Sequence, residues 1–339
     1  MCIVLTIFVL HKITSSMTLM KFLVYFIVLT ISLYIYYRYA QKKNILDNPN
    51  ERSSHTTPTI RGGGIIFFLA GLLYFLWPFH IPYPYFLIGF ILLSIVGFID
   101  DRKTLSAKLR FPFQLLAIAL ILYDSGLFTG NLPWYVQLIG FVVAVGFINA
   151  FNFMDGINGI TGFYTIAIIL PLIYLNNKYQ IIDQQWFYIM LMAIAIFGYF
   201  NFRKKALMFA GDIGSMALAS LLLFWLSKMM ITLKSPILLA LVVIYGIDSA
   251  WTILYRLKNR QNIFEAHRWH LYQKLVDKWH WSHLKVAVLY AGIQLIVSLF
   301  AIKFINTSYS LQLIITIGIY LTFSFIYFLG QRYFSNKAN

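Results

Sequence analysis

The stretch YSLQLIITIGIYLTFSFIYFLG, residues 309–330, contains no charged side chain. An α-helix needs about 20 mostly apolar residues to cross the hydrocarbon core of a bilayer, so this stretch is long enough to span a membrane. The whole chain of 339 residues is 60% hydrophobic and 11% charged. Soluble domains have roughly one quarter charged residues, so the composition predicts an integral membrane protein.

Ten more apolar runs of this kind precede that stretch along the chain. They lie at about 20–40, 63–80, 85–99, 112–128, 133–150, 161–176, 184–200, 214–230, 235–254 and 284–304. The sequence therefore predicts an all-α fold, a polytopic transmembrane helical bundle of about 11 spans, with one domain over residues 17–339. Residues 1–16 are predicted to be a non-functional extension, because their short apolar run breaks at His11 and Lys12 without a signal-peptide cleavage site.

The basic residues predict the orientation of the bundle. Of the 27 Lys and Arg residues, 21 lie in the loops that would share one face with the C-terminal tail. Basic loops stay in the cytoplasm, so the N-terminus is predicted outside and the C-terminus inside. The net charge of +16 is explained by this rule, and with almost no soluble surface to carry a basic groove we expect no nucleic-acid partner.

Acidic residues gather on the same predicted face, which holds nine of the 11 Asp and Glu residues. A transporter or flippase of lipid-linked sugars would instead place polar groups near the bilayer midplane and on both faces. The distribution favours an enzyme with a cytoplasmic site over that alternative. Cys2 is the single cysteine, so the chain has no disulfide and no cysteine pair.

Two short motifs place carboxylates where helices meet the cytoplasm. GFIDD ends a span with Asp100 and Asp101, and GDIGS opens another with Asp212. Taken alone, the first favours a solvated helix end and the second a helix cap. Adjacent carboxylates also suit a magnesium-bound phosphate, and a helix N-terminus favours an anion, so both are candidates for a phosphate site.

The segment NAFNFMDGINGITG, residues 149–162, is the most informative in the chain. Asn149, Asn152, Asp155 and Asn158 recur every three residues among apolar and glycine residues. A spacing of three drifts around an α-helix, so these side chains share a face only if the segment tightens or unwinds. A plain polar turn remains the alternative, although a turn needs no three carboxamides at a membrane edge.

Three further features supply polar groups at this face. Asp248 lies inside a span and is interpreted either as a functional group or as the buried partner of a cation. The basic loop 255–284 contains His267, Arg268 and His270, which suit a diphosphate clamp or, alternatively, contact with anionic lipid heads. The loop 46–64 has two prolines and three consecutive glycines, which predicts an irregular segment that either lines the site or serves as a linker. Its donors to anions are Arg52, His55 and Arg61.

The order of these motifs resembles one family, the polyprenyl-phosphate N-acetylhexosamine-1-phosphate transferases. The resemblance covers PNERSSHTTPTIRGGG, GFIDD, NAFNFMDGINGITG, AGDIGS, the Asp248 helix and AHRWHLYQKL, within residues 46–275. It implies a multi-pass enzyme of a bacterial cytoplasmic (inner) membrane that transfers a sugar 1-phosphate from a UDP-N-acetylhexosamine to undecaprenyl phosphate and releases UMP. The implied cofactor is Mg²⁺, with Mn²⁺ as an alternative, and a homodimer is left open.

The same resemblance implies roles for individual residues. Asn152 and Asp212 correspond to metal ligands or their neighbours, whereas Asp100, Asp101, Asp155 and His267 correspond to catalytic positions. The implied substrate-binding residues are Asn149, Asn158, Arg52, His55, Arg61, Asp248, Arg268 and His270.

Departures from the family pattern bear on the donor. Many members have Asp where this chain has Asn158, and the pentapeptide transferases have three consecutive histidines where this chain has the sequence HRWH. The second departure argues against a phospho-muramoyl-pentapeptide transferase, which is the alternative within the family. The loops look most like the branch that starts O-antigen and lipopolysaccharide synthesis, so we expect UDP-GlcNAc or a 6-deoxy relative as donor.

Overall fold

The computed structural model describes residues 19–49, 57–76, 81–262 and 267–336 of the chain, and these residues are nearly all helical. The long helices are α2 (Leu19–Lys42), α3 (Ile65–Leu76), α4 (Pro84–Arg102), α5 (Ala107–Ser125), α6 (Trp134–Phe153), α7 (Ile160–Tyr179), α8 (Gln184–Asn201), α9 (Gly211–Leu233), α10 (Val243–Lys258), α12 (His283–Ala301) and α13 (Tyr309–Asn336). The shorter elements are α11 (Leu271–Trp279), the 3₁₀ helices η1 (Pro236–Val242) and η2 (Ile302–Phe304), and the strands β1 (Leu46–Asp47) and β2 (Thr59–Ile60).

Each of the eleven predicted apolar runs coincides with a helix of the described chain. Eight helical segments are long and apolar enough to cross a membrane, with η1–α10 and α12–η2 each counted as one. Helix α3 is too short for that set, and α5 and α8 also fall outside it. The protein is thus a polytopic helical membrane protein, as predicted, while the count of 11 spans and the orientation remain predictions.

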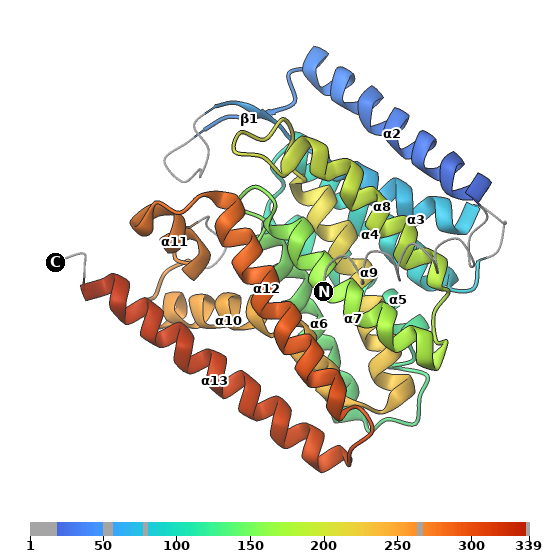
Figure 1. Ribbon diagram of the computed structural model, residues 1–339, viewed down its shortest axis with the longest axis vertical. Helices are drawn as coiled ribbons and strands as arrows, with labels where there is room; N and C mark the ends of the chain where they lie inside the picture. Colours follow the sequence, from blue (N-terminus) through green and yellow to red (C-terminus); the bar gives the residue numbers. More distant parts are fainter. Residues whose placement is uncertain (1–18, 50–56, 77–80, 263–266, 337–339) are drawn as a thin grey trace.

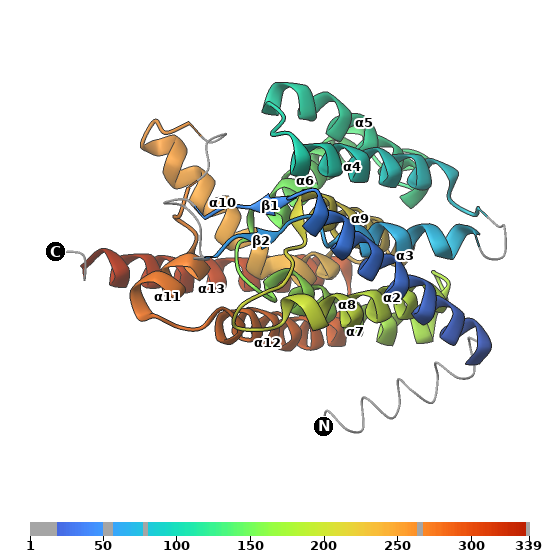
Figure 2. The same cartoon turned by 90° about the horizontal axis from the view of Figure 1, so that it is seen from above.

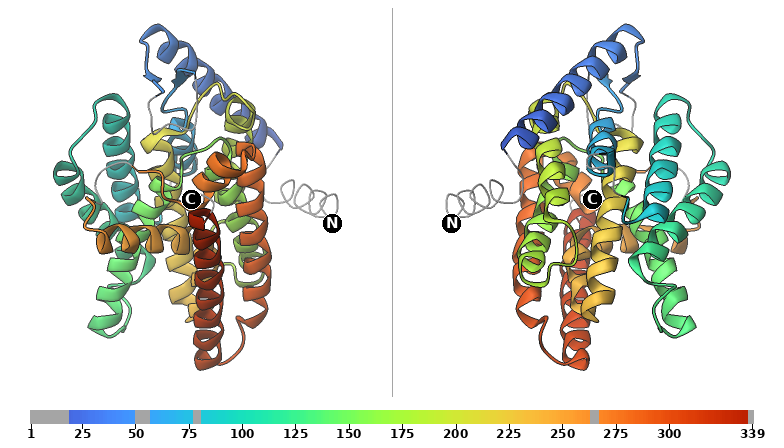
Figure 3. Two further views of the ribbon diagram at one scale, coloured as in Figure 1. Left: turned by 90° about the vertical axis from the view of Figure 1, so that its left-hand side faces the viewer. Right: turned by 90° about the vertical axis from the view of Figure 1, so that its right-hand side faces the viewer.

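Peripheral helices present apolar side chains outward. Only 22% of the most apolar stretch of α2 and 17% of that of α13 is buried inside the molecule, and large aliphatic and aromatic residues on both are exposed. Figure 3 shows α2 leaning away from the bundle, and Figure 1 shows α13 along its edge. Such surface is stable only against lipid, so these helices are interpreted as the lipid-facing layer.

Helix α9 lies at the centre of the bundle and buries side chains on every side. Helix α4 packs along it so closely that a Cβ on Gly97 would lie 2.7 Å from the carbonyl oxygen of Asp212. The last turn of α4 therefore lies directly beside the first turn of α9. This approach of two helix ends creates the polar site described below.

Some helix boundaries differ from the predicted ones because polar caps extend the helices. Helix α5 begins at Ala107 rather than near residue 112, since the Ser106 hydroxyl accepts a hydrogen bond from the Leu109 N–H. The described part of the loop 46–64 forms the two-stranded pairing of β1 with β2, which the sequence did not predict. This pairing holds the end of the loop, with Arg61, over the bundle.

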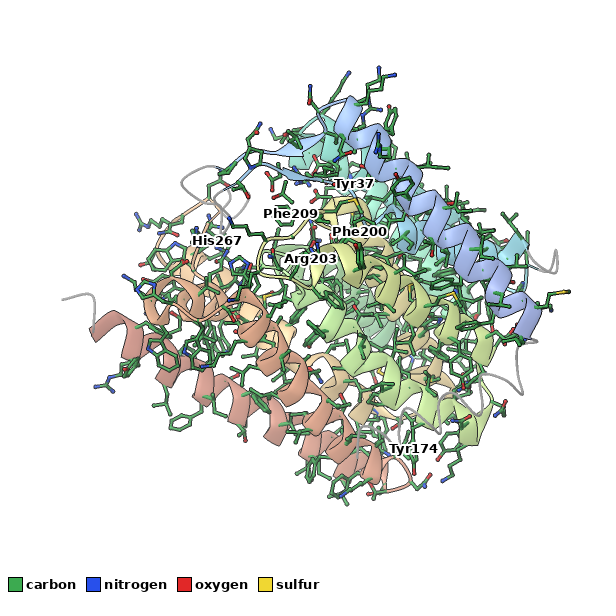
Figure 4. All side chains as sticks on the ribbon, turned by 45° about the horizontal axis from the view of Figure 1, so that its top comes forward. Tyr37, Tyr174, Phe200, Arg203, Phe209 and His267 are labelled. Carbon is green, nitrogen blue, oxygen red and sulfur yellow. The ribbon has the colours of Figure 1, made fainter. Side chains whose placement is uncertain are left out.

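The polar connections gather at one end of the molecule. Strands β1 and β2, the 202–210 connection and α11 lie at that end in Figure 1, and Figure 2 shows the same grouping from above. In Figure 4, Arg203, Phe209 and His267 lie toward this end, whereas Tyr174 lies at the opposite end. The segments that the sequence assigned to the cytoplasm are therefore neighbours in space.

Candidate active site

Three carboxylates meet where α4 ends and α9 begins. Asp100 and Asp101 are only 6% and 9% exposed, so the pair is not the solvated helix end that it favours when taken alone. The Asp101 carboxylate accepts hydrogen bonds from the backbone N–H groups of Asp212 (2.8 Å) and Ile213 (3.1 Å). The capping role favoured for Asp212 alone is thus performed by Asp101, and the Asp212 side chain remains available for other partners.

Two arginines neutralise part of this charge. Arg61 lies 2.7 Å from Asp101 and 3.2 Å from Asp212, so the end of the 46–64 loop lines the site. Arg110, from α5, bridges Asp100 and Asp212, with 3.4 Å to the latter. The carboxyl groups of Asp100 and Asp212 also lie within hydrogen-bond range of each other. We call these five residues the carboxylate cluster, and its formal charge is negative.

The segment 149–162 leaves the α-helix only over residues 154–159, because α6 ends at Phe153 and α7 begins at Ile160. Asn152 accepts a hydrogen bond from the Ser215 hydroxyl at 2.6 Å, which places its side-chain oxygen beside the first turn of α9. Asn149 instead donates to the Val145 carbonyl one turn earlier in its own helix. Of this pair, Asn152 is the one that the fold brings next to the carboxylate cluster.

Asp155 and Asn158 have different surroundings in the connection between α6 and α7. Asp155 accepts a hydrogen bond from the Thr161 hydroxyl, and burial raises the pKa of its carboxyl to about 6. The Asn158 amide donates to the carbonyls of Arg203 (2.9 Å) and Lys204 (3.2 Å). Asn158 therefore fastens the connection to the neighbouring 202–210 segment, whereas Asp155 keeps an acidic group near the cluster.

Asp248 is enclosed by donors from the chain itself. Its carboxylate accepts from the backbone N–H groups of Leu271 (3.0 Å) and Tyr272 (3.4 Å), from the Tyr290 hydroxyl (2.7 Å), and lies 3.2 Å from the His270 Nδ1. We call these residues the Asp248 network. Both Asp248 and His270 are 2% exposed, so Asp248 is a buried acid whose partners are backbone, tyrosine and histidine groups rather than a lysine or an arginine. The His270 Nε2 has no hydrogen-bond partner in the described part of the chain.

Two other residues of the predicted diphosphate clamp, Arg268 and His267, have different surroundings. Arg268 forms an ion pair with Asp277 on α11, at 2.5 Å and 3.1 Å. Burial, with His270 and Arg256 nearby, lowers the pKa of His267 to about 3, so its imidazole is uncharged at neutral pH. His267 is therefore a hydrogen-bonding group rather than a cation. Arg52 and His55 lie outside the described residues.

Comparison with known proteins points to the same region. The model of a family described as "Glycosyl transferase family 4" matches residues 83–234, which run from the start of α4 to the end of α9 and include Asp100, Asp101 and Asp212. Over these residues the chain is similar to glycosyl transferase family 4. It is also 25% identical over 279 residues, or 75% of each chain, to a protein named "Probable undecaprenyl-phosphate N-acetylglucosaminyl 1-phosphate transferase" from Bacillus subtilis (strain 168). Both findings support the predicted family, the polyprenyl-phosphate N-acetylhexosamine-1-phosphate transferases.

Several residues of this candidate site escaped the sequence interpretation. Arg110 was counted only as a topological charge, although its position ten residues after Asp100 on the next helix allows the pairing observed. Ser215, within the GDIGS motif, contacts Asn152, and Tyr272 contacts the α6–α7 connection. A hydroxyl inside a recognised motif is a usable signal for Ser215, whereas no local pattern marks Arg110 or Tyr272.

The oxygen donors of the candidate site suit a hard cation. Carboxylate and carboxamide oxygens from Asp100, Asp212 and Asn152 lie around the first turn of α9, and Mg²⁺ prefers oxygen ligands. In the described residues, no group of three or more His, Cys, Asp or Glu side chains is already arranged to hold a metal ion. The two arginines occupy the carboxylates instead, so a cation would replace part of their contacts.

Proposed function

We propose that this membrane transferase moves an N-acetylhexosamine 1-phosphate from a UDP-sugar to undecaprenyl phosphate and releases UMP. The observation that carries the proposal is the carboxylate cluster, in which Asp100, Asp101 and Asp212 are paired with Arg61 and Arg110. The three carboxylates and Arg110 lie inside the region matched by the family model. The name of the Bacillus subtilis relative supports the acceptor class and the sugar class.

The reaction joins two anions, and this determines what the site must supply. An oxygen of the lipid phosphate forms a bond to the sugar-bearing phosphorus, while the bond from that phosphorus to the UMP oxygen breaks. A phosphate monoester carries about 1.5 to 2 negative charges at neutral pH, so the nucleophile scarcely needs a base. The site must instead offset repulsion and fix an in-line approach.

The residues of the cluster match these needs. We propose that Asp212 and Asn152, with Asp100 adjacent, hold Mg²⁺ or Mn²⁺, which when bound supplies positive charge for the phosphate oxygens. Arg61 and Arg110 are then released from part of their carboxylate contacts and become donors for phosphate. Asp155, whose pKa is about 6, is largely ionised at pH 7.5 and adds a further oxygen acceptor near the same face.

The donor and the pathway are the narrower part of the proposal. The HRWH sequence at residues 267–270 lacks three consecutive histidines, which favours a small UDP-N-acetylhexosamine over a pentapeptide-bearing donor. We propose UDP-GlcNAc or a 6-deoxy relative, used at the cytoplasmic face of a bacterial inner membrane in starting O-antigen or another envelope glycan. A site that hydrogen-bonds a sugar hydroxyl discriminates strongly between such donors.

A direct assay tests this function. Purified protein in detergent is mixed with undecaprenyl phosphate and, in turn, UDP-GlcNAc, UDP-N-acetylquinovosamine, UDP-N-acetylfucosamine and UDP-MurNAc-pentapeptide, and both UMP and the lipid product are measured. We expect turnover with at least one small donor, and loss of turnover in EDTA that added Mg²⁺ restores. A preference for the pentapeptide donor overturns the donor assignment. UMP release that persists in EDTA overturns the proposal that the reaction requires a metal ion.

A further inference from the structure

Helix α11 is joined to the candidate site through one aromatic side chain. Tyr272, in its first turn, is fully buried, and its hydroxyl donates to the Phe153 carbonyl at 3.3 Å. Phe153 is the last residue of α6, immediately before the unwound connection that contains Asp155. The tyrosine therefore reaches from the Asp248 network to the backbone beside Asp155.

Gly156 forms the other side of this contact. A Cβ placed on Gly156 would lie 2.1 Å from the Tyr272 hydroxyl oxygen and 3.1 Å from the ring carbon that carries it. Real Cβ atoms do not approach other atoms to 2.1 Å, so the tyrosine fits only because residue 156 has no side chain. Contact is thus made on both sides of Asp155, at residue 153 by a hydrogen bond and at residue 156 by close packing.

The tyrosine is itself held firmly. Asp248 accepts from the backbone N–H of Tyr272 and of Leu271, which fixes the first turn of α11. The Tyr272 ring is stacked on His270 with the centroids 5.6 Å apart, and meets the Tyr290 ring edge-on at 6.3 Å. A side chain fixed in this way transmits position, because neither its backbone nor its ring can shift without breaking a buried contact.

The connection itself has little internal support. Residues 154–159 lie outside α6 and α7, so their backbone conformation depends on contacts with other segments. On one side, Asn158 donates to the 202–210 segment and the Gly159 N–H donates to the Asn201 side-chain oxygen at 2.7 Å. On the other side, the contacts include Tyr272 and the His283 Nδ1, which accepts from the Asn158 N–H at 3.4 Å.

We propose that Tyr272 is a positioning residue of the transferase, which sets the backbone of the α6–α7 connection and with it the placement of Asp155. This inference rests on the proposed function, since it concerns the turnover of the same site. Asp248 acts indirectly, because it holds Tyr272 in place. Neither residue needs to contact the substrate. The position of the NAFNFMDGINGITG segment then depends on the position of the 255–284 loop, although about 100 residues separate the two in the sequence.

A double-mutant cycle tests the contact. In Gly156→Ala the added methyl group meets the tyrosine hydroxyl, so the connection must shift, and we expect kcat to fall about tenfold or more. Tyr272→Phe removes the oxygen that the methyl would strike, so the double variant Gly156→Ala with Tyr272→Phe is expected to regain most of the turnover of Tyr272→Phe alone. Equal losses from Gly156→Ala in the wild-type and the Tyr272→Phe backgrounds would overturn the proposal.

Two matched controls and a second measurement keep the test specific. Gly146→Ala adds a methyl group on α6 where no atom lies within 4 Å, and Tyr320→Phe removes a buried hydroxyl that donates to the Leu239 carbonyl, so both are expected to retain wild-type kcat. Amide hydrogen exchange over residues 153–160 is measured on the same proteins without substrate. We expect faster exchange in Gly156→Ala and recovery in the double variant, while unchanged exchange in Gly156→Ala contradicts the coupling. If the wild type has no turnover, the proposed function fails, and the exchange cycle still decides the contact.

Discussion

The carboxylate cluster and the Asp248 network lie at the same end of the molecule, and the partners of Asp212 in the first differ from those of Asp248 in the second. In the carboxylate cluster, three acids share two arginine side chains, and two of the carboxyl groups lie within hydrogen-bond range of each other. In the Asp248 network, a single acid accepts from two backbone N–H groups and a tyrosine hydroxyl and lies beside a histidine. Within the cluster, Asp100 and Asp101 also accept from backbone N–H groups, as Asp248 does, whereas the Asp212 side chain is paired with the two arginines.

The difference shows how a carboxylate's partners indicate its role. An arginine can release one carboxylate and bind a phosphate, since its guanidinium has five donors on a flexible stem. A backbone N–H at the start of a helix cannot move away without unwinding the helix. Acids partnered by side chains are therefore able to exchange ligands during a reaction, and an acid partnered by backbone is a structural anchor.

The largest expected effect is on thiol labelling, which tests whether the carboxylate cluster and the Asp248 network face the same side of the membrane. In a Cys2→Ser background, single cysteines replace Thr104, beside the cluster, and Gln261, in the loop that follows α10. We expect a membrane-impermeant thiol reagent to miss both in intact cells and to label both once the inner membrane is opened. A cysteine at Gln180, on the opposite predicted face, is the control and should react in intact cells. Labelling of only one of the first two would separate the two regions.

A matched pair of substitutions gives the next largest effect. Asp212→Asn removes the charge from the proposed metal ligand, so we expect turnover to fall by a factor of about 10² or more, the magnitude typical of lost electrostatic stabilisation. Its thermal unfolding in detergent should change little, since Arg61 keeps Asp101 and Arg110 keeps Asp100. A variant that unfolds on purification would contradict the view that this acid is replaceable in the fold.

The other member of the pair, Asp248→Asn, should reverse that pattern. The new amide points a donor at positions now filled by the N–H donors of Leu271 and Tyr272 and by the Tyr290 hydroxyl. One buried group left without a partner costs about 1–3 kcal/mol, so the unfolding temperature should drop clearly. Turnover measured well below that temperature should fall less than in Asp212→Asn. Wild-type stability of Asp248→Asn would contradict the interpretation of Asp248 as a structural anchor.

The smallest expected effect concerns pH. Burial raises the pKa of Asp155 to about 6, above the ordinary aspartate value of 3.8, so the folded protein binds this proton more tightly than the unfolded chain. Stability from this group is present at low pH and is lost as the pH rises from about 4 through 6. In EDTA, the unfolding temperature of the wild type relative to Asp155→Asn should therefore fall over that range and stay level above pH 7. A constant difference from pH 4 to 7 would contradict the raised pKa.

Sequence reasoning found the helices because each apolar run must be buried in lipid or protein, whatever its neighbours are. It also singled out Asp100, Asp101, Asn152 and Asp212 as candidates, because polar groups at helix ends in so apolar a chain need an explanation. The ion pairs of these residues could not be predicted from the sequence. Arg61 and Asp212 are 151 positions apart in the chain, and only the packing of the helices brings their side chains together. For the same reason the network around Asp248, which joins α10, α11 and α12, had no local signal.

The place where α3 begins has one more consequence. A Cβ on Gly64 would lie 2.2 Å from the Cα of Gly214, and a Cβ on Gly214 would lie 2.7 Å from the Cα of Gly64. The two backbones thus contact each other three residues after Arg61 and two residues after Asp212. A methyl group on either glycine would separate the two backbones and increase the distance between the Arg61 guanidinium and the Asp212 carboxylate, although no charged residue is changed.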